Sequence, residues 1–499
     1  MLLPIWCIAA FLLFMFFRLS VAWFTRHRGC DAWFFLLCAE QFRIHRRLPV
    51  RLPSLYMLEP DEQWYPPGFI VFCALFSDAF LKKYHWAITH IVDGIIACIL
   101  FLGGYTITGQ IPLSLWGVAM YALQPALIME YSNLTSRPLG CAFQFAFVLC
   151  SYAGIHCDLY FFPAAIFFGV LLLYTHKLST QILWFLFPFF AIMERDVSWV
   201  FILFFTYFIA FLLRPGYFTK ILRAHWDIVR FWHKHWAWLG AHQVKDSPLY
   251  GHQPFRAGYY AQSWSFFLRS FIKTVLTNCT IVFTIPALIF FNNLDLFAQF
   301  CLFWVLGVHI WAIFVQFLPF LRCIGIGIQY LKYSYLPSLF LAVELLFFFN
   351  GYGLYNHSVA IILLMCLLYK YARLIRHCQK NRPEQECSED LDNQFNFLRN
   401  APDARILTLP LSLADITAYK TRKPVCWGTH GYGFVSAEYV LPVLKKKLSW
   451  LMKRYGLTHL LLDERYTNIR ELQITPDALL KREGYYAVYQ LSETSFVKQ

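Results

Sequence analysis

Residues 26–68, RHRGCDAWFFLLCAEQFRIHRRLPVRLPSLYMLEPDEQWYPPG, separate the first apolar run of the chain from the second. This polar stretch places acidic and basic side chains between segments that are apolar enough to enter a membrane. Charged groups held at the edge of a bilayer usually have a function. The acidic ones are Asp31, Glu40, Glu59, Asp61 and Glu62, and the basic ones are Arg26, Arg28, Arg43, Arg46, Arg47 and Arg51.

Asp31 is the most suggestive of these carboxylates. It lies within a turn or two of the end of the first apolar run and opens the aromatic segment 33–37, WFFLL. This amphipathic segment could lie in the plane of the membrane interface, with the carboxylate at the level of a lipid headgroup. The alternative is a solvated basic loop in which Asp31 caps a helix. Residue chemistry alone leaves both interpretations open.

The composition indicates a polytopic membrane protein. Of the 499 residues, 59% are hydrophobic and only 14% are charged, which lies far outside the range of soluble proteins. The 43 basic and 29 acidic residues give a net charge of +14, and most of them lie in loops. Anionic partners are therefore expected. Membrane lipids or lipid phosphates fit better than nucleic acid, because the sequence has no nucleic-acid-binding motif.

The cysteines and the amino-terminal run add little chemistry. The 15 cysteines are scattered, without a CxxC or a spacing typical of zinc ligands, so we interpret them as small buried apolar residues. Residues 1–24 are apolar, with no basic n-region and no clear small-residue cleavage site. We interpret this run as a retained first span, with a removed signal peptide as the alternative.

Eleven apolar runs are near the length that a membrane crossing needs. Residues 69–80 are apolar too, but they are too short to cross, and we expect a half-helix packed at the membrane face. The sequence thus predicts a polytopic all-α domain of about eleven transmembrane helices, with ten to thirteen as the range. The runs are 1–24, 86–104, 111–129, 138–154, 158–174, 180–193, 198–213, 271–291, 297–318, 334–349 and 358–372.

A small soluble α/β domain is predicted after the spans. We divide the chain into a membrane domain over 1–375 with a large loop at 25–85, a charged linker over 376–393, and the soluble domain over 394–499. Within the last we expect strands at 405–410, 424–428, 458–463 and 485–491, and a helix at 438–455 that Gly456 ends.

An odd number of spans puts the polar loops on one side of the membrane. The loop 25–85 then shares a side with 130–137, 175–179, 214–270, 319–333 and the soluble domain. That side carries nearly all of the Lys and Arg, so the positive-inside rule would make it cytoplasmic.

Four polar clusters fall on this shared side. Each residue taken singly is more typical of a snorkelling or capping side chain than of a catalytic one. Acidic groups facing several bases at one membrane surface favour a reaction that deprotonates one substrate and stabilises a phosphate on the other. The clusters are Asp31 with Asp61 and Glu62; Glu130, Tyr131, Asn133, Ser136 and Arg137; His176 with Lys177; and Arg322 with Lys332 and Tyr333.

The order of three motifs resembles the GT-C superfamily of integral-membrane glycosyltransferases, which use polyprenyl-phosphate-linked sugars. The motifs are GCDAWFFLLCAEQF at 29–42, DEQWYPPGF at 61–69 and EYSNLTSRPLG at 130–140. They are similar to those of oligosaccharyltransferase catalytic subunits and protein mannosyltransferases. The resemblance implies that Asp31 is the catalytic acidic residue and that Tyr65 belongs to the turn of the family. The segment 175–177, THK, and the basic residue before YLP also match many bacterial members.

The chain departs from the oligosaccharyltransferase pattern at two points. In place of an acidic metal-binding motif after the third span it has only Glu130 and then Arg137, which leaves a divalent metal possible but doubtful. It also lacks a WWD-like acceptor motif, so peptide glycosylation is not supported. The resemblance implies an extracytoplasmic active face, against the positive-inside rule. Bases that hold a lipid phosphate would explain the positive charge on that face.

These observations lead to one functional hypothesis and two rivals. The hypothesis is a GT-C type glycosyltransferase that moves a sugar from a polyprenyl-phosphate carrier to a lipid, glycan or protein acceptor. No cofactor is certain. A bacterial inner membrane is favoured over the endoplasmic reticulum as its location. The rivals are a transporter or flippase for an anionic lipid, which would usually show internal repeats that we do not find, and a non-catalytic scaffold. Asp31 is the general base; Arg137, Lys177, Arg322 and Lys332 hold the phosphate; Asp61, Glu62, Tyr65, Glu130 and His176 complete the substrate site.

Overall fold

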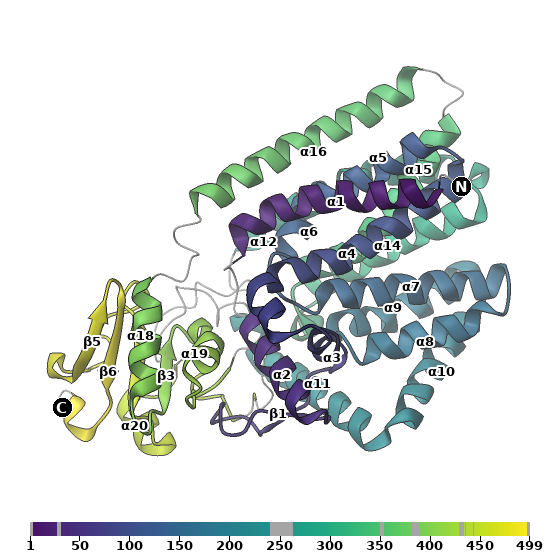
Figure 1. Ribbon diagram of the computed structural model, residues 1–499. Coiled ribbons are helices and arrows are strands. Elements are labelled where there is room, and N and C mark those ends of the chain that lie inside the picture. Colours follow the sequence, from purple (N-terminus) through teal and green to yellow (C-terminus); the bar gives the residue numbers. More distant parts are fainter. Residues whose placement is uncertain are drawn as a thin grey trace. The chain divides into compact units, whose positions relative to one another are not determined.

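The computed structural model describes residues 3–26, 31–239, 263–349, 354–381, 389–428, 434, 436–442 and 444–496. The chain forms two compact units, each assembled from segments that are distant in the sequence (Figure 1). The first unit comprises Met1–Arg28, Tyr84–Phe218 and Leu268–Gln385. The second comprises Gly29–Lys83, Thr219–Phe267 and Glu386–Gln499.

The first unit is a bundle of apolar helices. In it α7 packs against α8, α10 packs against both α8 and α9, and α14 packs against α9 and α15 (Figure 1). The helices are α1 (Leu3–Thr25), α4 (Asp78–Thr108, in this unit from Tyr84), α5 (Ile111–Ala122), α6 (Pro125–Glu130), α7 (Arg137–His156), α8 (Phe161–Leu173), α9 (Lys177–Glu194), α10 (Ser198–Leu213), α12 (Trp264–Thr277, in this unit from Leu268), α13 (Thr284–Ile289), α14 (Leu296–Phe317), α15 (Tyr335–Phe348) and α16 (Leu354–Lys380).

Every apolar run of the sequence contains helix, but fewer than eleven helices are long enough to cross a membrane. Six in the described part of the chain pass by length and apolar character, or seven if the bent pair Trp264–Thr277 and Cys279–Ile289 is one span. The two halves of that pair meet at 81°. Three more apolar helices, α5, α8 and α10, have only 10–17 residues. The chain is thus a multi-pass membrane protein, and the count of eleven spans is not confirmed.

A buried ion pair joins three of these helices. The Arg18 guanidinium on α1 lies 3.2 Å from the Asp93 carboxylate on α4, and both side chains are fully buried. Tyr121 on α5 donates its hydroxyl hydrogen to Asp93 Oδ1 over 2.6 Å, and its backbone carbonyl accepts from Arg18. The guanidinium also faces the rings of Phe14 and Tyr121. In an apolar interior such charges persist only when paired, so the pair fixes how α1, α4 and α5 meet.

The second unit combines the first polar loop with the carboxyl-terminal segment. Its sheet has the order β3-β4-β6-β5, with β3 and β4 parallel and the other pairs antiparallel. The elements are α2 (Asp31–His45), β1 (Val50–Arg51), β2 (Glu62–Gln63), α3 (Gly68–Ala74), α11 (Pro215–His235, in this unit from Thr219), α18 (Glu389–Asn400), β3 (Ile406–Leu409), α19 (Ala414–Thr421), α20 (Leu448–Tyr455), β4 (His459–Asp463), β5 (Leu479–Glu483) and β6 (Tyr486–Gln490).

Three sequence-based predictions for the second unit were only partly correct. Residues 424–428 make isolated bridges instead of a strand, through Val425 to Tyr56 and Ile406. The helix expected from Glu438 begins only at Leu448, although Gly456 ends it in the left-handed conformation as expected. The half-helix expected over 69–80 is divided between α3 and the first turn of α4.

The aromatic face of helix α2 is covered by protein. Phe34, Phe35 and Leu37 are at most 1% exposed, and they are covered by protein within the second unit. Phe34 and Phe35 contact the ring of Tyr65, and Phe35 also contacts Phe69 on α3. Helix α19 covers α2 as well. The side chains Phe34, Phe35 and Leu37 therefore do not face lipid, and a position of α2 at the membrane interface stays a prediction. The sequence could not show this cover, because α19 comes from a remote part of the chain.

We expect Asp93→Ala to lower the free energy of unfolding by about 3 to 5 kcal/mol, because it leaves the Arg18 guanidinium buried without its carboxylate. Unfolding of the purified protein by denaturing detergent in mixed micelles measures this change. Glu493→Ala is the control, because it removes an exposed ion pair with Lys453 and should cost about 1 kcal/mol or less. Equal stability of the two variants would contradict the structural role of Asp93.

Candidate functional site

The polar site of the first unit is centred on the carboxylate of Glu130. Helix α6 ends at Glu130 and α7 begins at Arg137, where Pro138 fits the first turn because its missing N–H is not needed there. Lys332 Nζ lies 2.9 Å and Arg137 Nη1 3.0 Å from the same oxygen, Glu130 Oε1. Lys332 belongs to the 3₁₀ helix η7 (Gly327–Ser334). The segments 130–137 and 319–333, which are remote in sequence, therefore meet here.

The cluster has room and charge for an anion. One carboxylate faces two cations, and the side chain of Lys332 is only 5% exposed. Glu130 and Lys332 line a cavity of about 150 Å³, together with Thr274 and Tyr335. A buried ammonium requires compensation by negative charge. The remaining positive charge of the three groups suits a phosphate oxygen at this cavity.

A chain of hydrogen bonds connects His176 to the same 3₁₀ helix. His176 caps α9, and its Nδ1 accepts from the backbone N–H of Ser179 over 3.3 Å. In the neutral ring the hydrogen therefore lies on Nε2. Ser179 Oγ lies 2.8 Å from Nδ1 and 2.8 Å from the hydroxyl of Tyr333. His176 thus holds Tyr333, the neighbour of Lys332, in place.

Gly140 permits the close approach of α7 to this histidine. A Cβ atom at position 140 would overlap Cβ of His176 and lie 2.8 Å from its Cγ. Gly140 stands one turn after Arg137 on α7. A glycine at this position therefore couples the helix that carries Arg137 to the start of α9.

The structure brings three of the four sequence clusters together in the first unit. Glu130 and Arg137, His176, and Lys332 with Tyr333 are joined by the contacts described above. Lys177 is the first residue of α9, directly after His176. Arg322 lies in the 3₁₀ helix η6 (Pro319–Ile324), on the segment that leads to Lys332, and is partly buried.

Asp31 belongs to the second unit and is the first residue of α2. A carboxylate in the first turn is stabilised by the helix dipole, which agrees with both the capping and the catalytic interpretation. Helix α2 is held firmly within its unit. Trp33 packs on Tyr419 of α19, and Arg422 pairs with Glu40 over 2.6 Å. The carboxyl-terminal segment therefore positions the helix that carries Asp31.

The other predicted residues of the first cluster have partners within their own loop. Asp61 Oδ1 accepts from the backbone N–H of Ser54 over 2.7 Å, and Glu62 pairs with Arg51 over 2.9 Å across the β1–β2 ladder. Tyr65 is 9% exposed and packs on the aromatic face of α2. These contacts hold the loop in shape, and a role in substrate binding remains a prediction.

A buried polar contact joins this loop to the carboxyl-terminal segment. The Tyr56 hydroxyl donates to Asp415 Oδ1 over 2.7 Å, and Glu59 Oε1 accepts from the backbone N–H of Gly428 over 3.0 Å. Burial, and then the negative charge of Asp415, raise the pKa of Tyr56 well above its usual range. Tyr56 therefore stays a neutral donor at any physiological pH.

The described residues give no direct sign of a metal site. Among them, no three His, Cys, Asp or Glu side chains come together in an arrangement that could hold a metal ion. Glu130, the carboxylate at the position of the family's acidic motif, is engaged by two cations that would oppose a metal ion.

Sequence reasoning missed Arg18 and Asp93, although their signal was visible. Both lie inside apolar runs, and an ionisable residue within a span is expected to have a partner inside the bundle. His90 lies one turn before Asp93 and is fully buried too. The four polar clusters all lie in loops between the apolar runs, whereas Arg18 lies within the run 1–24 and Asp93 within the run 86–104.

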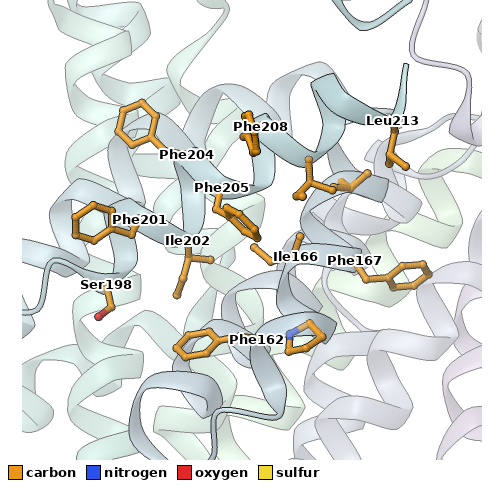
Figure 2. A pocket seen from close by; sticks show the side chains of 13 residues that line it. Phe162, Ile166, Phe167, Ser198, Phe201, Ile202, Phe204, Phe205, Phe208 and Leu213 are labelled. Atoms are coloured by element: carbon orange, nitrogen blue, oxygen red, sulfur yellow. The ribbon is translucent and has the colours of Figure 1, made fainter. Parts of the chain in front are cut away.

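A large apolar groove lies between α8 and α10. Its volume is about 980 Å³ and its lining consists of aromatic and aliphatic side chains with Ser198 and Pro163. Figure 2 shows the rings of Phe201, Phe204 and Phe208 along one helix and Phe162 and Phe167 along the other. This lining offers no acid, base or charge. It suits hydrocarbon chains and does not suit the chemistry of a transfer reaction.

Comparison with known proteins identifies the fold. No protein-family model and no curated protein sequence matches the chain. Among solved structures, ArnT from Cupriavidus metallidurans bound to undecaprenyl phosphate matches with a TM-score of 0.51 and 11% identity, over 98% of this chain and 99% of that one. The chain has the fold of the GT-C glycosyltransferases.

Archaeal structures lead to the same conclusion. The oligosaccharyltransferase AglB from Archaeoglobus fulgidus, in complex with an inhibitory peptide and a dolichol-phosphate, matches with a TM-score of 0.55 and 9% identity, over 92% of this chain and 69% of that one. The apo form of the Archaeoglobus fulgidus oligosaccharyltransferase gives a TM-score of 0.56 at 10% identity with the same coverage. The resemblance of the sequence motifs to the GT-C superfamily is confirmed at the level of fold.

We expect Gly140→Ala to lower the free energy of unfolding by about 1 to 3 kcal/mol, because the added methyl group forces α7 and His176 apart. Gly216→Ala is the matched control, because a Cβ at position 216 meets nothing within 4 Å and alanine favours a helix. Thermal unfolding in detergent, followed by tryptophan fluorescence, compares the two. If Gly140→Ala were as stable as Gly216→Ala, the close approach would have no structural importance.

Proposed function

We propose that this protein is a GT-C glycosyltransferase that moves a sugar from a polyprenyl-phosphate carrier to a lipid, glycan or protein acceptor. The observation that carries the proposal is the shared carboxylate oxygen of Glu130, which faces both Lys332 and Arg137 beside a cavity. This arrangement leaves positive charge for a phosphate group. In the proposed reaction a lipid phosphate is the leaving group, and this positive charge stabilises it. The likeness to solved GT-C structures with bound lipid phosphates supports this assignment.

The proposed mechanism divides the reaction between a base and an anion site. A hydroxyl oxygen of the acceptor attacks the anomeric carbon of the sugar, and the bond from that carbon to the phosphate oxygen breaks. The carboxylate of Asp31 takes the proton of the acceptor hydroxyl. The carrier leaves as a phosphate with the bonding electron pair, and cations stabilise the charge that develops on it.

Specific roles follow for the basic residues. Lys332 and Arg137 contact the phosphate oxygens, and the planar guanidinium of Arg137 offers two parallel N–H donors. Lys177, at the start of α9, and Arg322, in η6, add positive charge to the site. His176 positions Tyr333 and presents its Nε2–H as a donor. Asp61, Glu62 and Tyr65 shape the loop that presents the acceptor.

The choice of carrier is supported by the neighbouring structures. One was determined with undecaprenyl phosphate and another with a dolichol-phosphate. We assign a polyprenyl-phosphate-linked sugar to this chain on that basis.

The active face is proposed to be extracytoplasmic, in a bacterial inner membrane. The backbone N–H of Met57 donates to the carbonyl of Val425 over 2.9 Å, and the N–H of Leu58 donates to Cys426. Hydrogen bonds cannot reach across a bilayer of about 30 Å, so the first polar loop and the carboxyl-terminal segment share one side. The GT-C resemblance supports the extracytoplasmic side for that face.

We expect Asp31→Asn to reduce sugar transfer by a factor of about a hundred or more, because the amide cannot accept the proton of the acceptor. Transfer from a polyprenyl-phosphate-linked sugar to membrane acceptors, measured with purified protein, tests this. Asp158→Asn makes the same chemical change at an exposed loop position and should keep full activity. Near wild-type transfer by Asp31→Asn would show that Asp31 is only a helix cap.

A further inference from the structure

A second basic site lies on the first unit, between α12 and α16. It is a groove of about 720 Å³. Arg269 and Lys273 stand one turn apart on α12, and Lys370 and Arg373 stand one turn apart on α16. All four side chains line the groove, and none of its lining residues is acidic. None of these cations belongs to the Glu130 cluster.

The groove is amphiphilic. Beside the four cations its lining includes Ile272, Leu276 and Leu374, and Ile272 is 48% exposed while Leu276 is 57% exposed. A ligand that covers this lining needs an anionic group and a hydrocarbon part. The phosphate headgroup and upper chain of an anionic lipid supply both.

The position of the groove along α16 agrees with such a ligand. The membrane-spanning window of this helix is Ser358–Lys380, and Lys370 and Arg373 stand in its carboxyl-terminal half. Cations near the end of a span lie at the depth of the lipid headgroups. Lys370 Nζ also donates to the backbone carbonyl of Leu276 over 3.2 Å, which holds the two walls of the groove together.

Close spacing of the cations makes a counter-charge favourable. Like charges on neighbouring turns repel one another, and an anion between them removes that repulsion. Such a groove concentrates anions from the membrane surface. The guanidinium of Arg373 also lies over the ring of Tyr369, 5.9 Å from its centre.

The groove adjoins the cavity at Glu130 and Lys332. Its lining residue Lys273 precedes Thr274, which lines that cavity. The hydroxyl of Thr277 in the groove lies 3.3 Å from that of Tyr335 in the cavity wall. Part of α12 thus separates two positively charged sites.

We propose that the groove between α12 and α16 binds the phosphate headgroup of an anionic lipid. The headgroup contacts Arg269, Lys273, Lys370 and Arg373, and the chain lies on Ile272, Leu276 and Leu374. This binding requires no catalysis, so it stands independently of the proposed function. The lipid is either a bilayer phospholipid or a second polyprenyl phosphate, since both present the same chemistry.

Lipid titrations of the purified full-length protein in detergent test the proposal. The probes are phosphatidylglycerol, undecaprenyl phosphate and, as the neutral control, phosphatidylcholine, with bound lipid counted by native mass spectrometry. We expect the double variant Arg269→Gln with Arg373→Gln to lose about tenfold or more in affinity for an anionic lipid. Binding of phosphatidylcholine should not change. The loss should shrink at high salt, which screens the cations in the wild-type protein.

Two further variants make the result decisive. Lys453→Gln with Arg470→Gln removes the same charge from exposed positions of the second unit and should leave lipid binding as it is. Lys332→Ala should weaken only the binding at the Glu130 cavity, so one bound anionic lipid should remain. Loss with phosphatidylglycerol identifies a bilayer lipid, and loss restricted to undecaprenyl phosphate identifies the carrier. Unchanged affinity for both anionic lipids in a variant that melts like the wild type would overturn the proposal.

Discussion

The buried pair of Arg18 and Asp93 is the interaction on which the rest of the membrane unit depends. It is the point where α1, α4 and α5 are held to one another, with Tyr121 as the third member. Apolar helices in a bilayer have no strong hydrophobic reason to choose one neighbour over another. A charge pair with a satisfied hydrogen bond supplies that choice. Tyr121 stands shortly before α6 in the chain, so the pair also determines where the segment that ends at Glu130 can lie.

Glu130 joins segments in the polar site, as Asp93 joins helices in the bundle. Its carboxylate collects Arg137 from the start of α7 and Lys332 from η7. A single acidic group cannot neutralise both cations, and that imbalance is the physical basis of the proposed phosphate site. In the interior an apolar substitute would pack better than an ion cluster. The proposed reaction, which releases a phosphate, would give these charges a function.

Much of the architecture could be predicted from the sequence. The apolar runs located the helices, and the motifs around Asp31, Tyr65 and Glu130 indicated the GT-C fold. The loops 130–137, 175–179 and 319–333 were expected on one side of the membrane, and in the structure residues of all three are joined by contacts. Local patterns suffice for these features. A long run of apolar residues predicts a membrane helix, and the order of the motifs along the chain is typical of the fold.

Local patterns did not determine two kinds of feature, namely breaks within apolar runs and contacts between segments remote in sequence. The run 111–129 is divided between α5 and α6, and the run 271–291 bends at Asn278, so apolar length alone does not settle whether each run is one crossing. The aromatic face of α2 was expected at lipid because its cover, α19, lies nearly four hundred residues later. Arg18 and Asp93 stand in separate spans. Their partnership appears only when the helices are placed side by side.

The most direct test of the account is to follow the sugar and the carrier separately in one experiment. The purified protein is placed in lipid vesicles with a polyprenyl-phosphate carrier bearing a labelled sugar, and a membrane extract supplies acceptors. The account predicts that label moves to a new acceptor while an equal amount of free polyprenyl phosphate appears. Label that crosses the bilayer still attached to its carrier, with no free polyprenyl phosphate, would contradict it and indicate a transporter.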